Sequence, residues 1–328
     1  MDHRNSAHLP SESVSNDRRV SVVVPSHNHA SFVERALRSI FRQNFAPAQL
    51  LVIDDGSTDD SLRIIERVLR DCPFPCELIA RAQHGLCATL NEGLAKTHST
   101  YFAYLGSDDL WLPEFLAQRV SMLEFRPTAV LTYGHAFLID AADQIIDCTL
   151  DWAHYTDGDA RAMLWQENIA PMSPTVLHRR AALERYGWNE RARLEDYELY
   201  LRLSAAGEFA FDPGILSAWR QHGANSSRDF VWMIEARLEA QRNVAPELGL
   251  SAAELRRSQR ALNFAGAEDL LRLGDKKTAL KFLRQSTAPS YAARARVALR
   301  LLAPRFLIEW RRRQKQSRAG RRYGTAAI

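Results

Sequence analysis

The sequence predicts an α/β protein in which helices cover both faces of a parallel sheet. Over the first hundred residues, short apolar segments typical of buried strands alternate with segments whose apolar residues recur at helical spacing. With 46% hydrophobic and 25% charged residues, the chain has the composition of a folded protein. Its 328 residues are enough for one large or two modest domains.

The first predicted strand is residues 20–24, a mostly β-branched run that ends at Pro25. Apolar spacing over residues 32–41 predicts a helix after it, and Ser31 with Glu34 forms a capping-box pattern at its start. The alternation continues with strands at 50–53, 77–80 and 101–105 and helices at 62–69 and 86–96. Because crossover helices of about this length join parallel strands, a parallel sheet is expected.

Polar residues follow three of these strands. Pro25, Ser26 and Asn28 follow the first, Asp54 and Asp55 the second, and Asp108 and Asp109 the fourth. In open α/β sheets ligands bind beyond the carboxyl ends of the strands, so these side chains are expected to converge. A group of at least four carboxylates is unfavourable without a cation, and adjacent Asp oxygens suit Mg²⁺ or Mn²⁺.

Five segments in a particular order carry a resemblance to a known family. They are residues 22–28 (VVVPSHN), 52–59 (VIDDGSTD), 84–94 (HGLCATLNEGL), 104–113 (YLGSDDLWLP) and 194–203 (LEDYELYLRL). From about residue 20 to about 227, the chain resembles the family 2 inverting glycosyltransferases with a GT-A fold. The resemblance implies a GT-A type nucleotide-binding sheet. After it, apolar residues at helical spacing predict a C-terminal helical appendage, and the basic end of the chain predicts a basic tail.

The resemblance also implies a binding site for a nucleotide sugar, with UDP or dTDP as the expected carrier. The implied donor-binding residues are Pro25, Ser26, Asn28, Asp54, Asp55, Gly85, Asn91, Asp108 and Arg220. Asp55 suits the imide N–H of a uracil or thymine ring because an ionised carboxylate only accepts hydrogen bonds. Arg220 could offer its guanidinium fork to phosphate oxygens.

By the same resemblance, Asp109, Asp108 and His222 are expected to hold Mn²⁺ or Mg²⁺ against the donor diphosphate, where the metal would neutralise the leaving group. Gly106 stands where the family usually has an Asp, which leaves the number of protein ligands open. The two adjacent acids could instead be explained by turn chemistry alone. His222 could instead bridge two loops without binding a metal.

Inverting transfer needs a base that takes the proton from the acceptor hydroxyl. The resemblance implies Asp196 first and Glu195 second, although acids at the start of a helix are also favoured by its dipole. The expected acceptor is a saccharide or lipid-linked saccharide in surface polysaccharide assembly. A non-catalytic protein of the same fold that binds nucleotide sugars or glycans is the alternative.

The domain prediction is a flexible segment at 1–18, a GT-A domain at 19–227, a helical appendage at 228–287 and a basic amphipathic tail at 288–328. Charge is uneven: residues 281–328 hold thirteen Lys or Arg against Glu309, a net +12, so a total of +4 leaves −8 for residues 1–280. The tail is expected either to lie on an anionic membrane or to pack on the body. Because the body is acidic, no nucleic-acid partner is expected.

Four cysteines are too few for a secreted disulfide framework, and neither a signal peptide nor an apolar run of membrane-spanning length is seen. The expected location is the cytoplasm, with peripheral attachment to the cytoplasmic face of a membrane. Cys72, Cys76, His84 and Cys87 do not have the spacing of a zinc knuckle. The glycine signatures of dehydrogenases and of phosphate-binding loops are also missing.

Overall fold

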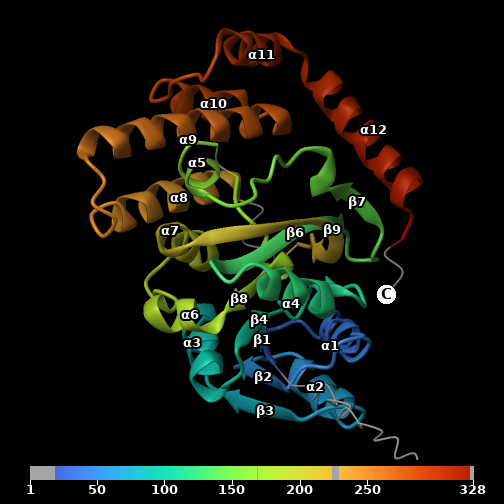
Figure 1. The fold of residues 1–328 in the computed structure, drawn as a ribbon. Helices are drawn as coiled ribbons and strands as arrows, with labels where there is room; N and C mark the ends of the chain where they lie inside the picture. Colours follow the sequence, from blue (N-terminus) through green and yellow to red (C-terminus); the bar gives the residue numbers. More distant parts are fainter. Residues whose placement is uncertain (1–18, 168, 224–228, 326–328) are drawn as a thin grey trace, which may run out of the picture.

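The computed structural model describes residues 19–167, 169–223 and 229–325. In this part of the chain a nine-stranded sheet runs through the body, and helices pack on both of its faces (Figure 1). The strand order is β3-β2-β1-β4-β8-β6-β9-β5, with β7 paired to β6. The predicted α/β fold class is confirmed.

One half of the sheet is parallel, as predicted. It consists of β1 (Val20–Ser26), β2 (Gln49–Asp55), β3 (Cys76–Arg81) and β4 (Tyr101–Tyr104). In the register, Val23 lies opposite Leu51 on one side and Tyr104 on the other. The carboxyl ends of these strands therefore lie along one edge, where the polar loops begin.

The other half of the sheet is mixed and was not predicted. It consists of β8 (Leu177–Arg179), β6 (Ala129–Ile139), β7 (Ile145–Cys148), β9 (Glu208–Arg220) and β5 (Leu110–Trp111). β8 is antiparallel to β4 and to β6, whereas β6 and β9 are parallel. Because β5 pairs with β9, opposing Leu110 to Ala218, the end of β9 lies beside the loop that follows β4.

Alternate residues of the parallel strands bury their side chains in two apolar layers. Val22 and Val24 face the layer formed with α1 (Val33–Phe41), α2 (Ser61–Leu69) and α4 (Phe115–Phe125). The opposite layer contains Val23 and packs against α3 (Leu86–Lys96), α5 (Arg161–Trp165), α6 (Arg180–Tyr186) and α7 (Glu195–Ala206). At Gly93, an added Cβ would lie 2.7 Å from Val23 Cγ1, so the glycine lets α3 lie close to β1.

The capping-box prediction for α1 was wrong. The helix begins at Val33 without a side-chain cap, and the carbonyl of His29 accepts the N–H groups of Phe32 and Val33. Glu34 accepts instead from Arg38 at 2.9 Å and from Arg67 of α2 at 2.5 Å. A backbone turn therefore closes the start of α1, and the acid joins two helices.

Among the described residues after the sheet there are five helices: α8 (Phe230–Val244), α9 (Ala252–Leu273), α10 (Lys276–Leu283), α11 (Tyr291–Leu302) and α12 (Arg305–Tyr323). The predicted break between α9 and α10 is present, with Gly274 at φ 87° and Asp275 capping α10. The domain boundaries stay predictions; residues 1–18 and the boundary at 227 lie outside the described residues.

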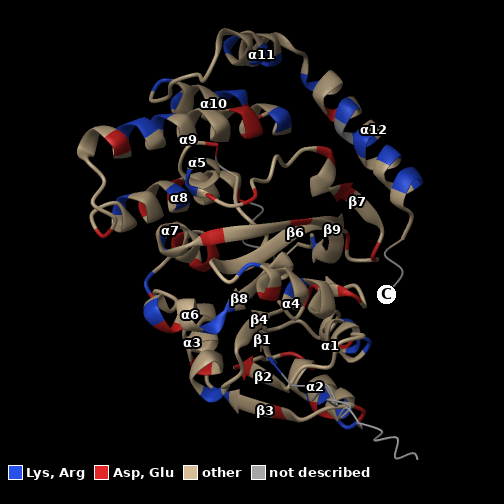
Figure 2. Ribbon diagram, in the orientation of Figure 1, with Lys and Arg blue, Asp and Glu red and all other residues tan. Residues whose placement is uncertain are grey.

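The last helix lies along the body and carries a band of basic residues (Figure 2). Lys315 pairs with Asp147 at 2.7 Å, Arg322 pairs with Asp151 at 2.8 Å, and the Tyr323 ring packs near Phe137. The end of the tail thus packs on the body, as one of the two predictions for it required. Within the described ranges, no helix is long and apolar enough to cross a membrane.

Candidate active site

The loops after β1 and β2 are joined by hydrogen bonds from Asn28. Its backbone N–H donates to Ser57 Oγ at 2.9 Å, and its side-chain oxygen accepts the N–H of Thr58 at 2.8 Å. Asn28 has a φ of 56°, in the left-handed region that Asn tolerates better than most residues. Two of the predicted loops are therefore held together by hydrogen bonds.

Asp55 lies buried at the end of β2, and its carboxylate organises the neighbouring strand. Its oxygens accept the N–H of His84 at 2.9 Å and of Gly85 at 2.7 Å, and they pair with the Arg81 guanidinium. Gly85 has a φ of 95°, which a residue with a side chain would adopt only with strain. The structure thus brings together the predicted Asp55 and Gly85 and adds Arg81, which was not predicted.

Three other predicted donor-site residues lie where β1 and β2 end. Asp54 accepts the backbone N–H of Ser57 at 2.9 Å and its hydroxyl at 2.6 Å, so it holds the turn after β2. Pro25 lies within β1, and the hydroxyl of buried Ser26 has no hydrogen-bond partner among the described residues. An unpaired buried hydroxyl at this edge is open to a ligand.

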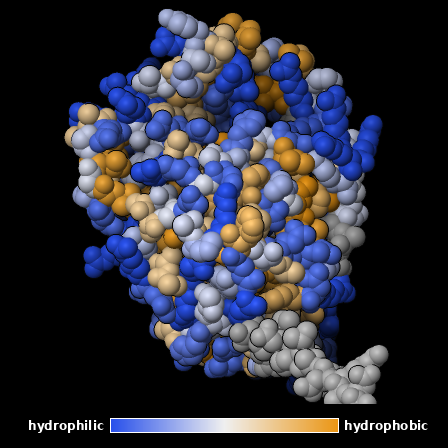
Figure 3. All heavy atoms as spheres, viewed as in Figure 1, coloured by the Kyte–Doolittle hydropathy of each residue, from blue (hydrophilic) through white to orange (hydrophobic). Residues whose placement is uncertain are grey.

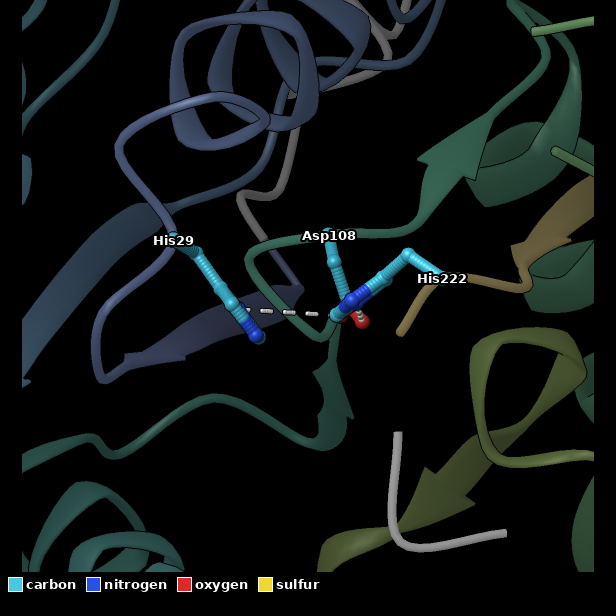
Figure 4. Close-up of side chains that lie close together, drawn as sticks. All are labelled: His29, Asp108 and His222. Atoms are coloured by element: carbon cyan, nitrogen blue, oxygen red, sulfur yellow. Dashed lines mark hydrogen bonds and ion pairs between the residues drawn. The ribbon is translucent and has the colours of Figure 1, made fainter. Parts of the chain in front are cut away.

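Asp108, His222 and His29 come together beyond the ends of β4, β9 and β1 (Figure 4). His222 Nε2 lies 2.9 Å from one oxygen of Asp108, and His29 Nδ1 lies 3.9 Å from the other. One ligand atom of each lies within 4.8 Å of the others, and the described part of the chain has no second His, Cys, Asp or Glu group with this property. Two imidazoles and one carboxylate are a donor set that fits a divalent metal.

The protonation states of this cluster also suit a metal. Burial raises the pKa of Asp108, but the hydrogen bond from His222 and the charges of both histidines outweigh it, and the net pKa is lowered. Burial lowers the pKa of His29. An ionised carboxylate and a neutral imidazole are the forms that bind cations.

Asp109 and Arg220 hold the loop that carries Asp108. Asp109 is buried and outside the cluster; its carboxylate accepts the backbone N–H of Arg220 at 2.8 Å, and burial together with the Asp108 charge raises its pKa. The buried guanidinium of Arg220 donates to the carbonyls of Asp108 and Asp140 at 2.7 and 2.8 Å and pairs with Asp143 at 2.5 Å. These contacts position the loop and direct the Arg220 fork into the protein.

The acid pair Glu195 and Asp196 occupies the first turn of α7, and both side chains are half-buried. Burial and the neighbouring Asp196 raise the pKa of Glu195 to about 8, and burial raises the pKa of Asp196. The predicted donor residue Asn91 contacts the segment before α7: its amide bonds the N–H and the carbonyl of Trp188, at 2.9 and 2.8 Å.

Two residues connect the acid pair to the rest of the site. Burial and the charge of Glu195 raise the pKa of Cys87, in the first turn of α3, to about 12. The same two causes raise the pKa of Tyr104, at the end of β4, well above its usual value. Because Cys87 follows Gly85 by two residues and Tyr104 precedes Asp108 by four, the acid pair lies at the same sheet edge as the other loops.

The set Cys72, Cys76, His84 and Cys87 does not form a metal site among the described residues. All four cysteines are free thiols. Sequence reasoning missed His29 and Arg81 as site residues. A signal for Arg81 was available, because it stands at the end of the third strand, where the strand-end rule applies.

Known proteins resemble this chain in sequence over about half to two-thirds of its length. The family model described as glycosyl transferase family 2 matches residues 21–187. An uncharacterised glycosyltransferase of Nostoc sp. is 26% identical over 170 residues, 51% of this chain and 52% of that protein. The chondroitin synthase of Escherichia coli is 26% identical over 217 residues, 63% of this chain and 30% of the synthase. The chain therefore spans about half or less of these relatives.

Solved structures share the fold over nearly the whole chain. A mannosyltransferase from Pyrobaculum calidifontis, in complex with GDP-Man and Mn²⁺, has a TM-score of 0.61 at 19% identity and covers 93% of this chain and 86% of its own. TarS 1–349 of S. aureus, in complex with UDP-GlcNAc, has a TM-score of 0.59 at 15% identity, with 94% and 93% covered.

Proposed function

Because this chain belongs to glycosyl transferase family 2 and has the GT-A fold of a glycosyltransferase, we propose that it is an inverting enzyme that uses a UDP- or dTDP-sugar. The observation that carries the proposal is the meeting, at one sheet edge, of the Asp55 carboxylate, the Asp108 cluster and the acid pair of α7. The chondroitin synthase relative supports an acceptor that is a saccharide or lipid-linked saccharide in surface polysaccharide assembly.

The donor nucleoside would bind between the first two loops. The Asp55 carboxylate, oriented by Arg81 and Gly85, would accept an imide N–H of the base. Asn28 and Ser26 line the same edge and offer polar groups to the nucleotide. A carboxylate cannot donate a hydrogen bond when ionised, so it favours bases that present an N–H at this point.

The donor diphosphate would lie at the Asp108 cluster. Asp108 and His222 would hold Mn²⁺ or Mg²⁺, which neutralises the charge that develops on the departing diphosphate. Asp109 as a further ligand stays a prediction, since its carboxylate accepts the Arg220 N–H. Arg220 would act on the diphosphate through the position of this loop.

Asp196 would be the base that takes the proton of the acceptor hydroxyl. Two adjacent carboxylates resist ionising together: burial and the neighbouring Asp196 raise the pKa of Glu195 to about 8, and burial also raises the pKa of Asp196. The pair therefore favours a form that keeps one proton, and we assign the charged, proton-accepting member to Asp196. Its place in the first turn of α7 restricts the directions in which it can point.

The C-terminal helices would attach the enzyme to the cytoplasmic face of an anionic membrane. Leu302, Phe306 and Trp310, around the junction of α11 and α12, are 80%, 67% and 56% exposed. Figure 3 shows hydrophobic side chains among hydrophilic ones at the top of the molecule, where these helices lie. Arginines at 300, 305 and 311 lie next to them in the sequence. Exposed apolar groups with basic neighbours match a bilayer with anionic headgroups.

Transfer assays test the proposed reaction. Purified protein would be incubated with UDP-, dTDP- and GDP-sugars, saccharide acceptors and Mn²⁺, and nucleoside diphosphate release would be measured together with the anomeric configuration of the product by NMR. Inversion of the donor's configuration is expected. If the protein binds a sugar donor but releases no nucleoside diphosphate with any acceptor, the result would instead support the alternative of a non-catalytic nucleotide-sugar or glycan-binding protein.

A further inference from the structure

We infer that His29 is a third protein ligand of the divalent metal, beside Asp108 and His222, and that the site therefore prefers transition metals to Mg²⁺. The inference rests on the proposed function only for the role of that metal at the donor diphosphate. Metal binding itself can be measured without any sugar donor.

His29 reaches the cluster from a loop different from those of its two partners. It follows β1, whereas Asp108 follows β4 and His222 follows β9. Figure 4 shows the three side chains directed toward one another. The imidazole rings of His29 and His222 lie 5.4 Å apart at 90°, one on each side of the Asp108 carboxylate. One ligand atom of each of the three residues lies within 4.8 Å of the other two.

A second contact fixes the orientation of the His29 ring. Its Nδ1 lies 2.8 Å from the hydroxyl of Ser107, which is buried, and its backbone N–H donates to Ser61 Oγ at 2.8 Å. Metal-binding histidines usually bond a protein group through one ring nitrogen and the metal through the other. With Nδ1 bonded to Ser107, Nε2 is the His29 nitrogen that remains for a metal.

The carboxylates of Asp108 and Asp109 crowd position 106 in the same loop. An added Cβ at Gly106 would lie 2.9 Å from an oxygen of Asp108 and 3.1 Å from an oxygen of Asp109. Position 106 is where an acid was expected from the resemblance. Here the imidazole of His29 supplies the additional donor from another loop.

Two imidazoles change which ions the site should prefer. Mg²⁺ favours oxygen ligands, whereas imidazole nitrogens bind Co²⁺ and Zn²⁺ well. A site made of Asp108, His222 and His29 should therefore bind Co²⁺ more tightly than Mg²⁺. Removing one imidazole should weaken Co²⁺ binding more than Mg²⁺ binding.

Calorimetric titration of the full chain with Co²⁺ and with Mg²⁺ tests this inference. We expect His29→Asn to weaken Co²⁺ binding at least about tenfold, since even loss of a ligand's hydrogen-bond partner costs 10–100-fold. The Mg²⁺ affinity should change less, and the visible spectrum of bound Co²⁺ should shift. His98→Asn, an exposed histidine before β4 at the opposite edge of the sheet, is the matched control and should behave as wild type.

Three outcomes would overturn the inference: wild type without a Co²⁺ preference, His29→Asn with wild-type Co²⁺ affinity, or equal losses for Co²⁺ and Mg²⁺. Equal losses would indicate a structural role for His29. Sugar transfer by wild type is measured separately, so a failed metal titration with intact transfer leaves the proposed function standing. A His29-dependent Co²⁺ site in a chain that transfers no sugar would support the metal-ligand inference and contradict the proposed function.

Discussion

Asp108 and Glu195 are carboxylic acids whose surroundings shift their pKa values in opposite directions. Asp108 faces two imidazoles, and its pKa falls in spite of burial. Glu195 faces Asp196 in a half-buried helix turn, and its pKa rises to about 8. A metal ligand must be ionised, and a neutral neighbour keeps the charge of an acid pair on one member. The two shifts therefore agree with the different tasks proposed for these residues.

At the residue scale, we expect Asp196→Asn to lower kcat by about 10²–10⁴ while donor affinity stays near the wild-type value, because general base catalysis contributes about this much. Turnover would be followed by nucleoside diphosphate release and donor binding by calorimetry. Glu195→Gln is the matched control and should retain much more activity. If Glu195→Gln lowered kcat much more than Asp196→Asn, the base would be Glu195.

The pKa of Glu195 also predicts how stability depends on pH. A carboxyl with a raised pKa binds its proton more tightly in the folded state, so its contribution to stability falls as pH rises from about 4.5 to about 8. Glu195→Gln removes this loss. The variant's Tm relative to wild type should therefore increase from about pH 5 to about pH 8, as measured by circular dichroism. A Tm difference between the variant and wild type that stays constant over this pH range would contradict the raised pKa of Glu195.

Contacts between residues far apart in the sequence explain why His29 was missed as a ligand. Neither the loop after β1 nor its HNH pattern indicates a metal site without the two other loops. The strand-end rule, by contrast, requires only local sequence, and it pointed to Asn28, Asp55 and Asp108, which lie at or just after the ends of β1, β2 and β4. The inward direction of Arg220 depends on buried Asp143, which local sequence does not reveal.

At the scale of elements, the parallel half of the sheet was predictable and the mixed half was not. Strands β1 to β4 and their crossover helices follow the simple alternation of apolar runs. β9 extends over Glu208–Arg220 with Asp212, Pro213 and Gly214 within it, residues that disfavour strand assignment. Its register with β6 shifts between Gly134 and His135. Tertiary pairing outweighs local preference there.

A buried ion pair joins α4 to β9 in this part of the fold. The Arg119 guanidinium is fully buried; it donates to the Thr175 carbonyl at 3.0 Å and pairs with Asp212 at 2.5 Å. We expect Asp212→Ala to lower the free energy of unfolding by about 3–5 kcal/mol, because it leaves a buried charge without its partner. Chemical denaturation would measure this loss.

Asp159→Ala is the control for that variant. Asp159 pairs with Arg161 at 2.6 Å, but both side chains are more than half exposed. Exposed pairs contribute about 0–1 kcal/mol, so the variant should unfold almost as wild type does. Similar losses for Asp212→Ala and Asp159→Ala would show that burial does not set the strength of the α4–β9 contact.

At the scale of the whole molecule, the two ends of α12 face different surroundings. Its C-terminal part pairs with acidic residues of the body through Lys315 and Arg322, and Phe306 and Trp310 near its start stay exposed. The two sequence-based predictions for the tail, membrane binding and packing on the body, are therefore compatible with each other. One face of the tail can pack on the body while apolar residues remain for another surface.

Replacing Leu302, Phe306 and Trp310 together by Ser should reduce flotation with anionic liposomes several-fold, because apolar area that would enter the bilayer is removed. Binding to neutral liposomes should be weak for both proteins. Phe125→Ser, on an 84% exposed side chain at the end of α4, is the control and should float as wild type does. Equal flotation of the triple variant and wild type would contradict membrane attachment through this surface.

The position of β9 between β6 and β5 has a consequence for synthesis of the protein. Asp108 and His222 are separated by 114 residues and meet only when β9, an internal strand made late, has entered the sheet. A ribosome-bound chain from which this strand has not yet emerged lacks one residue of the proposed cation site, and such long-range pairing is a slow step of folding. Under the proposed function, nascent and truncated chains would therefore be unable to use the sugar donor before the sheet is assembled.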